Sequence, residues 1–414
     1  MRLLHTRTLE FELCLGDSRP DYAILSHTWE PGEVLFEDAR HGGKHLRSCK
    51  KPGLSKLLMA AQKASDDGLK YIWVDTCCID KASSAELSEA INSMFRWYRD
   101  AAICYAFLSD YRSSSRQKRE GGLRSRWFTR GWTLQELIAP DDLEFYDATW
   151  KLCGHRIDLS AEVARVTGID ECVLQRHGRK AERCNSSGPV SVWQIDELLL
   201  RYGVSTKMSW AARRQTTRPE DIAYCLLGIF DVNMPLLYGE GGTKAFRRLQ
   251  EEIARRSQDH TLLTWKSINP YSVPGLFADN PSMFRDGHLY RPVRALRGTP
   301  ISFSNGGVEL DVHLAPCTCT MDTDRSTAEL LFGGEPIWLA ILNCTTEDHF
   351  TSPALLLRKT PRLASSFTHH ISLFELTGGY RHVLVSSGQS VLYLQSGGRK
   401  WSFHQNLRRD HVTP

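Results

Sequence analysis

Between Tyr22 and about Trp150, short apolar runs alternate with longer stretches whose apolar residues recur every three or four positions. A short apolar run is typical of a buried β-strand, and the longer spacing is typical of an amphipathic helix. Strands that alternate with helices predict a mainly parallel sheet with helices on its faces. The strands are expected at 22–25, 71–74, 103–108 and 143–146, and the helices at 54–64, 86–98 and 127–138.

Different patterns flank this region. Residues 8–13 alternate between polar and apolar types, which predicts an edge strand or a hairpin ahead of the sheet. Helical periodicity dominates from about 192 to 257, and alternating segments after about 269 predict an antiparallel β sandwich or partial barrel. We therefore expect an α/β domain with an N-terminal edge strand at 1–155, a helical region at 156–268 and a C-terminal antiparallel β domain at 269–414.

Charge and hydropathy exclude several classes of protein. Among 414 residues, 52 Lys and Arg stand against 48 Asp and Glu, so the net charge of +4 is too small to indicate nucleic-acid binding. No apolar run approaches the roughly 18 residues of a membrane helix. The first residues lack the apolar core of a signal peptide. These patterns predict a cytoplasmic protein without a membrane segment.

The 12 cysteines are scattered and form no paired Cys-x-x-Cys ligand sets. Several, such as Cys104 and Cys225, lie within apolar runs, where a free thiol behaves as a small hydrophobic group. This usage favours a reducing compartment. It also argues against a structural zinc site, so no metal is expected.

The chain turns abruptly polar after each of the first three expected strands, at 26–30, 75–80 and 109–111. In an open parallel sheet, ligands bind outside the carboxyl ends of the strands. Ser26 and Asp75 could therefore orient a hydroxyl-bearing substrate, and Trp29 could stack on a planar ring. The alternative is a capping role for Ser26 and Asp75 and a core-packing role for Trp29.

A single carboxylate lies in the aromatic and aliphatic stretch from Arg130 to Leu137. If this stretch is helical, Trp132, Gln135 and Glu136 share one face, because they are spaced by three and four positions. That face offers an indole, an amide and a carboxyl group that could stabilise developing positive charge. The alternative is a partly buried helix in which Glu136 pairs with Arg130 or a backbone group.

Two further residues near the strand ends are ambiguous. His27 either contacts substrate or is a structural histidine held by hydrogen bonds. A metal-binding role is not expected for it, because no second ligand stands at metal-binding spacing. Cys78 carries a thiol without an evident histidine partner. We predict Glu136 as the catalytic residue and a substrate-binding set made of Ser26, His27, Trp29, Asp75, Cys78, Arg130, Trp132 and Gln135.

The loop at 112–126 is strongly basic and leads directly to the Glu136 stretch. It is either a solvated loop or a cationic lid that attracts phosphate. No aromatic residues are interleaved with the charges of its first part, so nucleic-acid binding is not expected.

Three segments are distinctive in their order: Tyr22-Ala-Ile-Leu-Ser-His-Thr-Trp-Glu30, Tyr71-Ile-Trp-Val-Asp-Thr-Cys-Cys-Ile-Asp80 and Arg126-Trp-Phe-Thr-Arg-Gly-Trp-Thr-Leu-Gln-Glu-Leu137. Together they resemble the heterokaryon-incompatibility (HET) domain of filamentous fungi, over about residues 22–150. Residues 208–252 look like the region that commonly follows this domain. One departure is Cys77, where the family often has leucine.

HET domains are in turn similar to Toll/interleukin-1 receptor (TIR) domains, which implies a flavodoxin-like sheet. In NAD-cleaving members of that class the catalytic glutamate lies in a Trp-x-x-x-Glu-Leu helix, which Trp132 to Leu137 resembles. The resemblance therefore implies that Glu136 is catalytic, with NAD⁺ as a substrate and no cofactor. It implies a fungal incompatibility or cell-death effector that binds another incompatibility protein or itself. The alternative is a non-enzymatic module that triggers death by HET-domain self-association.

Overall fold

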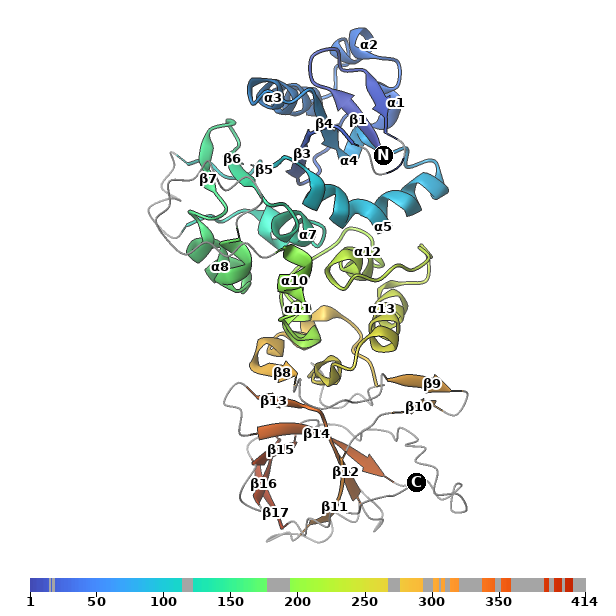
Figure 1. The fold of residues 1–414 in the computed structure, drawn as a ribbon, viewed down its shortest axis with the longest axis vertical. Helices are drawn as coiled ribbons and strands as arrows, with labels where there is room; N and C mark the ends of the chain where they lie inside the picture. The colour runs from blue at the N-terminus through green and yellow to red at the C-terminus, as the bar shows by residue number, and fades with distance from the viewer. Residues whose placement is uncertain are drawn as a thin grey trace. The chain divides into compact units, whose positions relative to one another are not determined.

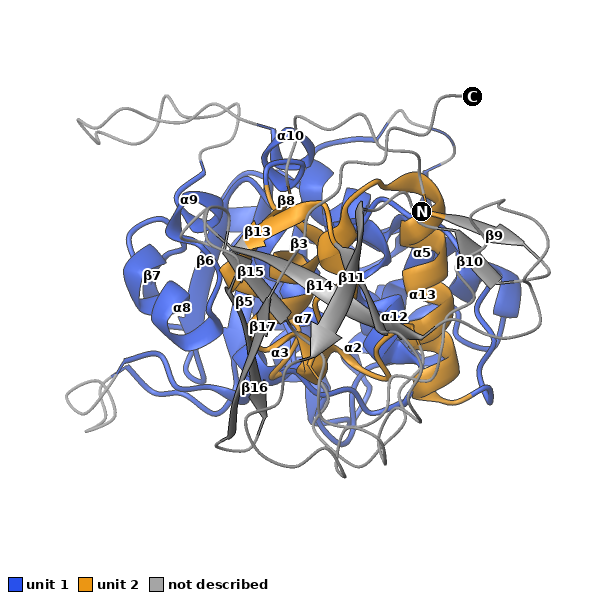
Figure 2. Cartoon of the chain, turned by 90° about the horizontal axis from the view of Figure 1, so that it is seen from below, with its two compact units in different colours: residues 1–201, 214–240 blue, residues 202–213, 241–414 orange. Residues whose placement is uncertain are grey.

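The computed structural model describes residues 1–14, 16, 19–113, 122–176, 194–266, 276–292, 301 and 342–345, and the backbone of further strands between 302 and 404. These residues form two compact units, coloured separately in Figure 2. Unit 1 comprises Met1–Arg201 and Arg214–Glu240, and unit 2 comprises Tyr202–Arg213 and Gly241–Pro414. Every residue predicted for the site lies in unit 1.

Unit 1 is built on a seven-stranded mixed sheet in the order β2-β1-β4-β3-β5-β6-β7 (Figure 1). Strand β3 lies between β4 and β5 and is parallel to both, and β6 continues parallel to β5. All of β3 is buried, as its apolar sequence predicts for a central strand. The strands are β1 (Arg2–His5), β2 (Phe11–Leu13), β3 (Tyr22–His27), β4 (Tyr71–Val74), β5 (Ile103–Leu108), β6 (Leu143–Asp147) and β7 (Leu152–His155).

The predicted parallel arrangement is correct for the four central strands, and the predicted N-terminal hairpin forms one edge, but the sheet as a whole is mixed. At one edge β1 and β2 form an antiparallel hairpin, and β1 pairs antiparallel with β4. At the other edge β7 returns antiparallel to β6. Both β1–β2 and β6–β7 are joined by short connections, which produce antiparallel pairs. The alternation at 8–13 marks only the second strand of the hairpin, because Leu9 lies in its turn with a positive φ of 57°.

The order of the central strands fixes where a ligand crevice is expected. From β3 the chain goes to β4 on one side and returns to β5 on the other side. This reversal is a topological switch point, at which open sheets bind ligands outside the carboxyl ends of the strands. Residues directly after β3, β4 and β5 therefore lie at the expected crevice.

Helices α3 (Gly53–Asp66) and α5 (Ser84–Asp100) form where helical periodicity predicts them. Helix α3 contacts β3 and β4, and α5 begins at Ser83, whose hydroxyl accepts from the Glu86 amide as an N-cap. The other helices of unit 1 are α1 (Phe36–Ala39), α2 (Gly43–Arg47), α4 (Asp75–Cys78), η1 (Arg126–Thr129), α7 (Thr133–Ile138), α8 (Ser160–Thr167), α9 (Glu171–Leu174), α10 (Ile195–Leu199), α12 (Asp221–Tyr224) and η3 (Leu227–Ile229).

The single helix predicted at 127–138 is wrong, because the stretch is interrupted in its middle. The 3₁₀ helix η1 ends before Arg130, whose backbone is extended, and α7 follows. The Gly131 amide donates to the Gln215 carbonyl at 2.8 Å. A Cβ at Gly131 would lie 2.5 Å from the Thr216 side chain, so the close approach of residues 215–216 requires glycine here.

Unit 2 contains helices and, among its described backbone, strands that pair antiparallel. Strands β8 and β13 form one pair, β9 and β10 another, and β11, β12 and β14–β17 form a sheet that closes on itself. The elements are α11 (Val204–Ser209), α13 (Gly242–Arg256), η4 (His260–Leu263), η5 (Pro281–Phe284), η6 (Gly287–Leu289), β8 (Tyr290–Pro292), β9 (Ser302–Ser304), β10 (Gly307–Glu309), β11 (His313–Cys319), β12 (Ile337–Ile341), β13 (Cys344–Thr346), β14 (Thr351–Arg358), β15 (Val383–Ser386), β16 (Val391–Ser396) and β17 (Arg399–His404). None of the helices in the described ranges is long and apolar enough to cross a membrane.

Candidate functional site

A buried chain of hydrogen bonds joins Glu136 to strand β3. The Ser26 hydroxyl donates to Glu136 Oε2 at 2.5 Å, and the Trp127 indole donates to Ser26 Oγ at 2.8 Å. Ser26 and Trp127 are fully buried, and Glu136 is 6% exposed. The structure thus brings together Ser26 and Glu136, two residues that the sequence predicts for one site.

Burial raises the pKa of Glu136 to about 8, and the negative charge of Asp75 acts in the same direction. Hydrogen bonds with Ser26 and Tyr98 and the positive charge of Arg214 oppose this rise only in part. A carboxyl group with a pKa near 8 changes its protonation state close to neutral pH. Such a group is suited to acid–base chemistry or to stabilising a cation in its ionised form.

A second cluster forms around Asp75, directly after β4. His27 Nε2 lies 3.1 Å from Asp75 Oδ1, and the Trp29 indole donates to Asp75 Oδ2 at 2.8 Å. Burial pulls the pKa of Asp75 upward, but hydrogen bonds and charges from His27, Lys81 and Trp29 outweigh it and lower the pKa to about 2. Asp75 is therefore an ionised carboxylate that orients His27 and Trp29.

Lys81 completes this cluster from the loop after α4. Its Nζ lies 3.4 Å from the centroid of the Trp29 ring, which is a close cation–π contact. Trp29 remains 47% exposed although its indole NH is held by Asp75. The cluster thus presents an exposed aromatic ring whose position is fixed by two charged groups.

The ends of β3 and β5 are linked as expected at a switch point. The Ser109 hydroxyl donates to Glu30 Oε1 at 2.9 Å, and it lies 3.4 Å from the Thr28 hydroxyl. Arg126 forms an ion pair with Glu30. Of the basic loop at 112–126, for which a solvated loop and a cationic lid are the alternatives, residues 114–121 lie outside the described residues, and Arg126 is its last member.

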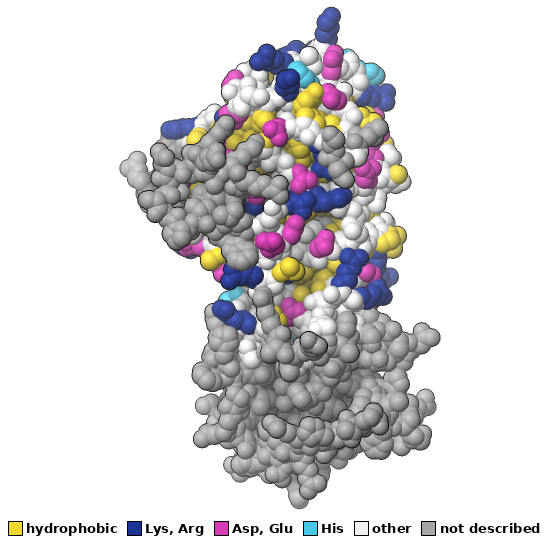
Figure 3. All heavy atoms as spheres, viewed as in Figure 1, with side chains coloured by type: hydrophobic (Ala, Val, Ile, Leu, Met, Phe, Trp, Pro, Cys, Tyr) yellow, Lys and Arg dark blue, Asp and Glu magenta, His cyan; other side chains and the backbone are white. Residues whose placement is uncertain are grey.

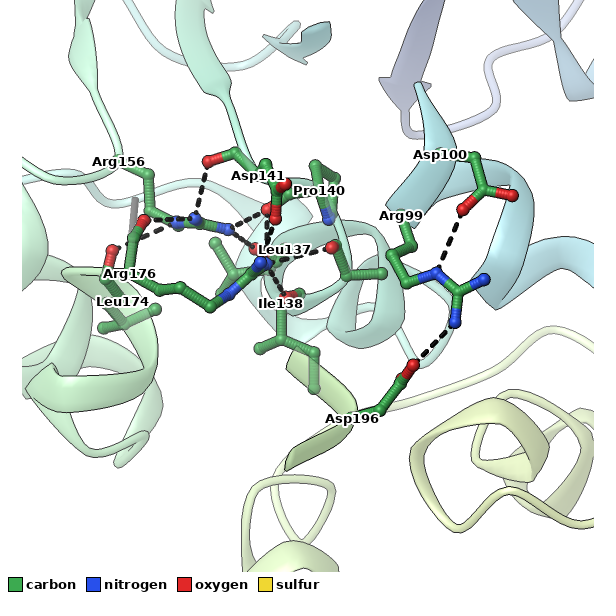
Figure 4. A network of polar contacts seen from close by, with 11 residues as sticks. Arg99, Asp100, Leu137, Ile138, Pro140, Asp141, Arg156, Leu174, Arg176 and Asp196 are labelled. Carbon is green, nitrogen blue, oxygen red and sulfur yellow. Dashed lines mark hydrogen bonds and ion pairs between the residues drawn. The ribbon is translucent and has the colours of Figure 1, made fainter. Parts of the chain in front are cut away.

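Two buried arginines hold the C-terminal end of α7, as Figure 4 shows. Arg156 donates to the carbonyls of Leu137 and Pro140, and Arg176 donates to those of Ile138 and Pro140. The last carbonyls of a helix have no partners within it and carry partial negative charge, so guanidinium groups stabilise them. These contacts fix the helix that carries Glu136.

Trp132 and Arg130 turn away from the Ser26–Glu136 contact. The Trp132 indole donates to Asp221 Oδ2 at 3.2 Å, and Arg130 donates to Thr217 Oγ1 at 3.0 Å. Both partners belong to the 214–240 segment of unit 1. The backbone of Trp132 is helical and its carbonyl accepts from the Glu136 amide at 3.5 Å, so the two residues keep the predicted helical spacing, while the Trp132 indole is held by Asp221.

Cys78 and Gln135 are buried at 2% and 1% exposure. The Cys78 thiol sulfur accepts from the Val74 amide at 3.4 Å, which is a structural contact at the start of α4. Gln135 Nε2 is buried without a hydrogen-bond acceptor among the described residues. Neither residue is placed in contact with Asp75 or Glu136 by a hydrogen bond in the described part of the chain.

Three residues of this region were missed by the sequence reasoning. Trp127 donates to Ser26, Lys81 covers Trp29, and the guanidinium of Arg214 donates to Thr133 Oγ1 of α7 at 2.9 Å. Lys81 lies shortly after the end of an expected strand, so its position in the sequence could have indicated that it belongs to this region. Arg214 is distant in sequence, and no local pattern points to it.

No group of three or more metal-ligating side chains occurs within the residues that the structure describes. Acidic and basic side chains are interspersed over the described surface of the face drawn in Figure 3. The described part of that face therefore carries no large field of one sign of the kind that steers nucleic acid.

Residues 22–120 match the family model for heterokaryon incompatibility protein (HET). The chain carries a HET domain. The resemblance predicted from the three segments is thereby confirmed, and Glu136 lies 16 residues beyond the matched range. Residues 244–280 match a domain of unknown function (DUF8212).

The chain is also 45% identical over 245 residues to the vegetative incompatibility protein HET-E-1 of Podospora anserina. The similarity covers 57% of this chain and 16% of that protein, so the chain spans a small part of its relative's length. No solved structure matches the chain.

Proposed function

We propose that the protein is a fungal incompatibility or cell-death effector of the cytoplasm, whose HET domain hydrolyses the nicotinamide–ribose bond of NAD⁺. The observation that carries the proposal is the Ser26–Glu136 hydrogen bond of 2.5 Å. It holds a titratable carboxyl group against the central strand, at the switch point where open sheets bind ligands. The role in incompatibility is supported by the HET match and by the relative named for vegetative incompatibility.

The order of the four central strands, β4-β3-β5-β6, supports a flavodoxin-like and hence TIR-like sheet. In chain order these are the second, first, third and fourth parallel strands, which is the flavodoxin-like arrangement. The antiparallel strands at both edges are additions to that arrangement. In a TIR-like sheet, the proposed reaction would take place at the carboxyl ends of β3 and β4.

In the proposed reaction, the bond between the nicotinamide nitrogen and ribose C1′ breaks, and nicotinamide leaves with the electron pair. Water adds to the oxocarbenium-like C1′ and releases one proton to solvent, which gives ADP-ribose. Ionised Glu136 would stabilise the developing positive charge or bind a ribose hydroxyl. Ser26 would hold the Glu136 carboxylate in place, and Trp29 would stack on a planar ring of the substrate.

The proposal is tested by nicotinamide release from NAD⁺, measured with the full chain at a concentration that permits self-association. Glu136→Gln should reduce turnover at least a hundredfold, which is the scale on which single catalytic groups act. The matched control is Glu144→Gln, which changes another carboxylate of unit 1, on β6. This variant should retain turnover. A folded Glu136→Gln variant with wild-type turnover would contradict the proposal.

A second candidate is a non-enzymatic module that triggers death by self-association or by binding another incompatibility protein. The near-complete burial of Glu136 and its bonding within the fold favour it, because such a group also serves a purely structural role. This candidate predicts that Glu136→Gln keeps the death phenotype as long as the variant folds. Sedimentation of the full chain would then detect assemblies without nicotinamide release.

A further inference from the structure

The ammonium group of Lys81 has an unusual environment in the described part of the chain. Its Nζ is buried, lies over the Trp29 ring and has no acceptor among the described residues. An ammonium carries three N–H donors, and burying them without hydrogen-bond acceptors costs free energy. The aromatic ring offsets part of this cost by attracting the charge, but it accepts no conventional hydrogen bond.

The neighbouring carboxylates are already engaged by other donors. Asp75 Oδ1 faces His27 and Asp75 Oδ2 accepts from Trp29. Glu33, whose negative charge also acts on Lys81, accepts from Lys56 Nζ at 2.5 Å. The positive charge of Arg218 adds to that of Lys81. The cluster therefore favours a further anionic acceptor at Lys81.

Trp29 supplies the second half of a recognition site. It follows β3 and Lys81 follows β4, so both lie beyond the carboxyl ends of adjacent parallel strands. Almost half of the Trp29 side chain is exposed, although its NH edge is held by Asp75 and one face by Lys81. A tryptophan that is exposed and yet fixed is suited to stacking on a planar ring.

We infer that Trp29 and Lys81 form a nucleotide-binding site, in which the indole stacks on the base and Lys81 donates to a phosphate oxygen. A planar ring and an anionic group close together are the two features of a nucleotide that this pair recognises. The inference deepens the proposed function and rests on it in one respect, since it assigns the phosphate of the dinucleotide substrate to Lys81. When phosphate binds, the Lys81 ammonium leaves its contact with Trp29. The phosphate oxygens then accept hydrogen bonds from its N–H groups.

The test is calorimetric titration of the full chain with AMP, ADP-ribose and adenosine, none of which can release nicotinamide. AMP and ADP-ribose should bind at least tenfold more tightly than adenosine, and this difference should shrink as salt is raised. Lys81→Met should remove the difference between AMP and adenosine. Lys63→Met, which changes a lysine paired with Asp67 on α3, is the matched control.

Lys81→Met removes a buried ammonium that has no hydrogen-bond acceptor among the described residues, so the variant is expected to fold. If Lys81→Met fails to fold, the comparison of AMP with adenosine on the unaltered chain still decides the matter. Equal affinity for the two ligands, absence of binding by AMP and ADP-ribose, or unchanged AMP affinity in a folded Lys81→Met variant would overturn the inference. Tight binding of ADP-ribose without nicotinamide release would overturn the proposed hydrolase and leave the nucleotide site standing.

Discussion

Asp75 and Glu136 are two acidic residues of unit 1, and folding moves their pKa values in opposite directions. Asp75 is surrounded by His27, Trp29 and Lys81, and its pKa falls to about 2 despite its burial. Glu136 has the hydroxyl groups of Ser26 and Tyr98 beside it, and burial raises its pKa to about 8. The difference lies in the partners, because both groups are removed from water to a large extent.

This contrast assigns distinct tasks to the two groups. Asp75 stays ionised at every physiological pH and serves as a fixed acceptor that orients the ring of Trp29. Glu136 alternates between protonation states near neutral pH. Pairs of carboxyl groups whose environments separate their pKa values are a recurring arrangement in active sites. The contrast thus supports Glu136, rather than Asp75, as the reactive group.

The largest expected effect concerns the stability of Glu136→Gln as a function of pH. A carboxyl group whose pKa is raised from 4.5 to about 8 on folding destabilises the protein increasingly as pH rises through this window. Above pH 8 the penalty is roughly 4–5 kcal/mol, and below pH 4.5 it vanishes. Glu136→Gln should therefore gain stability relative to the unaltered protein between pH 4 and pH 9.

The difference in stability is measured by urea unfolding. Hydrogen exchange of peptides from β3 and α7 monitors the unfolding of unit 1. Glu144→Gln should show no comparable gain with pH. A stability difference for Glu136→Gln that is independent of pH would show that folding leaves the pKa of Glu136 unchanged, and the contrast with Asp75 would be lost.

The next effect concerns Asp75→Asn. A carboxylate whose pKa is lowered from 3.8 to about 2 stabilises the fold above pH 3.8, and this contribution is lost as pH falls through 2. The variant should lose about 2 kcal/mol at neutral pH and almost nothing near pH 2. Because the charge of Asp75 raises the pKa of Glu136, the midpoint of the rise of kcat/KM with pH should move below 8.

Asp67→Asn at the C-cap of α3, which changes an aspartate paired with Lys63, is the control and should leave the midpoint in place. An unchanged midpoint in Asp75→Asn would mean that the two carboxyl groups do not interact. The two clusters would then have to be treated as independent sites.

The central strands could be predicted from the sequence to within two residues, because buried parallel strands are continuous apolar runs. The same logic placed Ser26 and Asp75 beyond or near strand ends, which meet at one edge of the sheet. The break before α7 could not be predicted, because it depends on Gly131 meeting Gln215 far along the chain. No local periodicity encodes such a contact.

The 214–240 segment also explains which indole contacts the Ser26–Glu136 pair. Helical spacing put Trp132 on the face of Glu136, but Asp221 holds its indole. The indole that reaches the Ser26–Glu136 pair belongs to Trp127, from the preceding turn of 3₁₀ helix. The sequence motif points to Glu136, but only the fold shows that Trp127 is the aromatic residue next to the Ser26–Glu136 pair.

The smallest expected effect comes from Ser26→Ala. Loss of the hydroxyl removes a hydrogen bond that lowers the pKa of Glu136, so the midpoint of kcat/KM against pH should rise above 8. It also leaves the Trp127 indole without its acceptor, which should cost about 1–3 kcal/mol of stability. Ser109→Ala removes another hydroxyl near the strand ends, one that donates to Glu30, and should leave the midpoint unchanged. If Ser26→Ala lowers the midpoint, Ser26 does not stabilise the carboxylate form, and the pKa of Glu136 would be set by burial, Asp75, Tyr98 and Arg214.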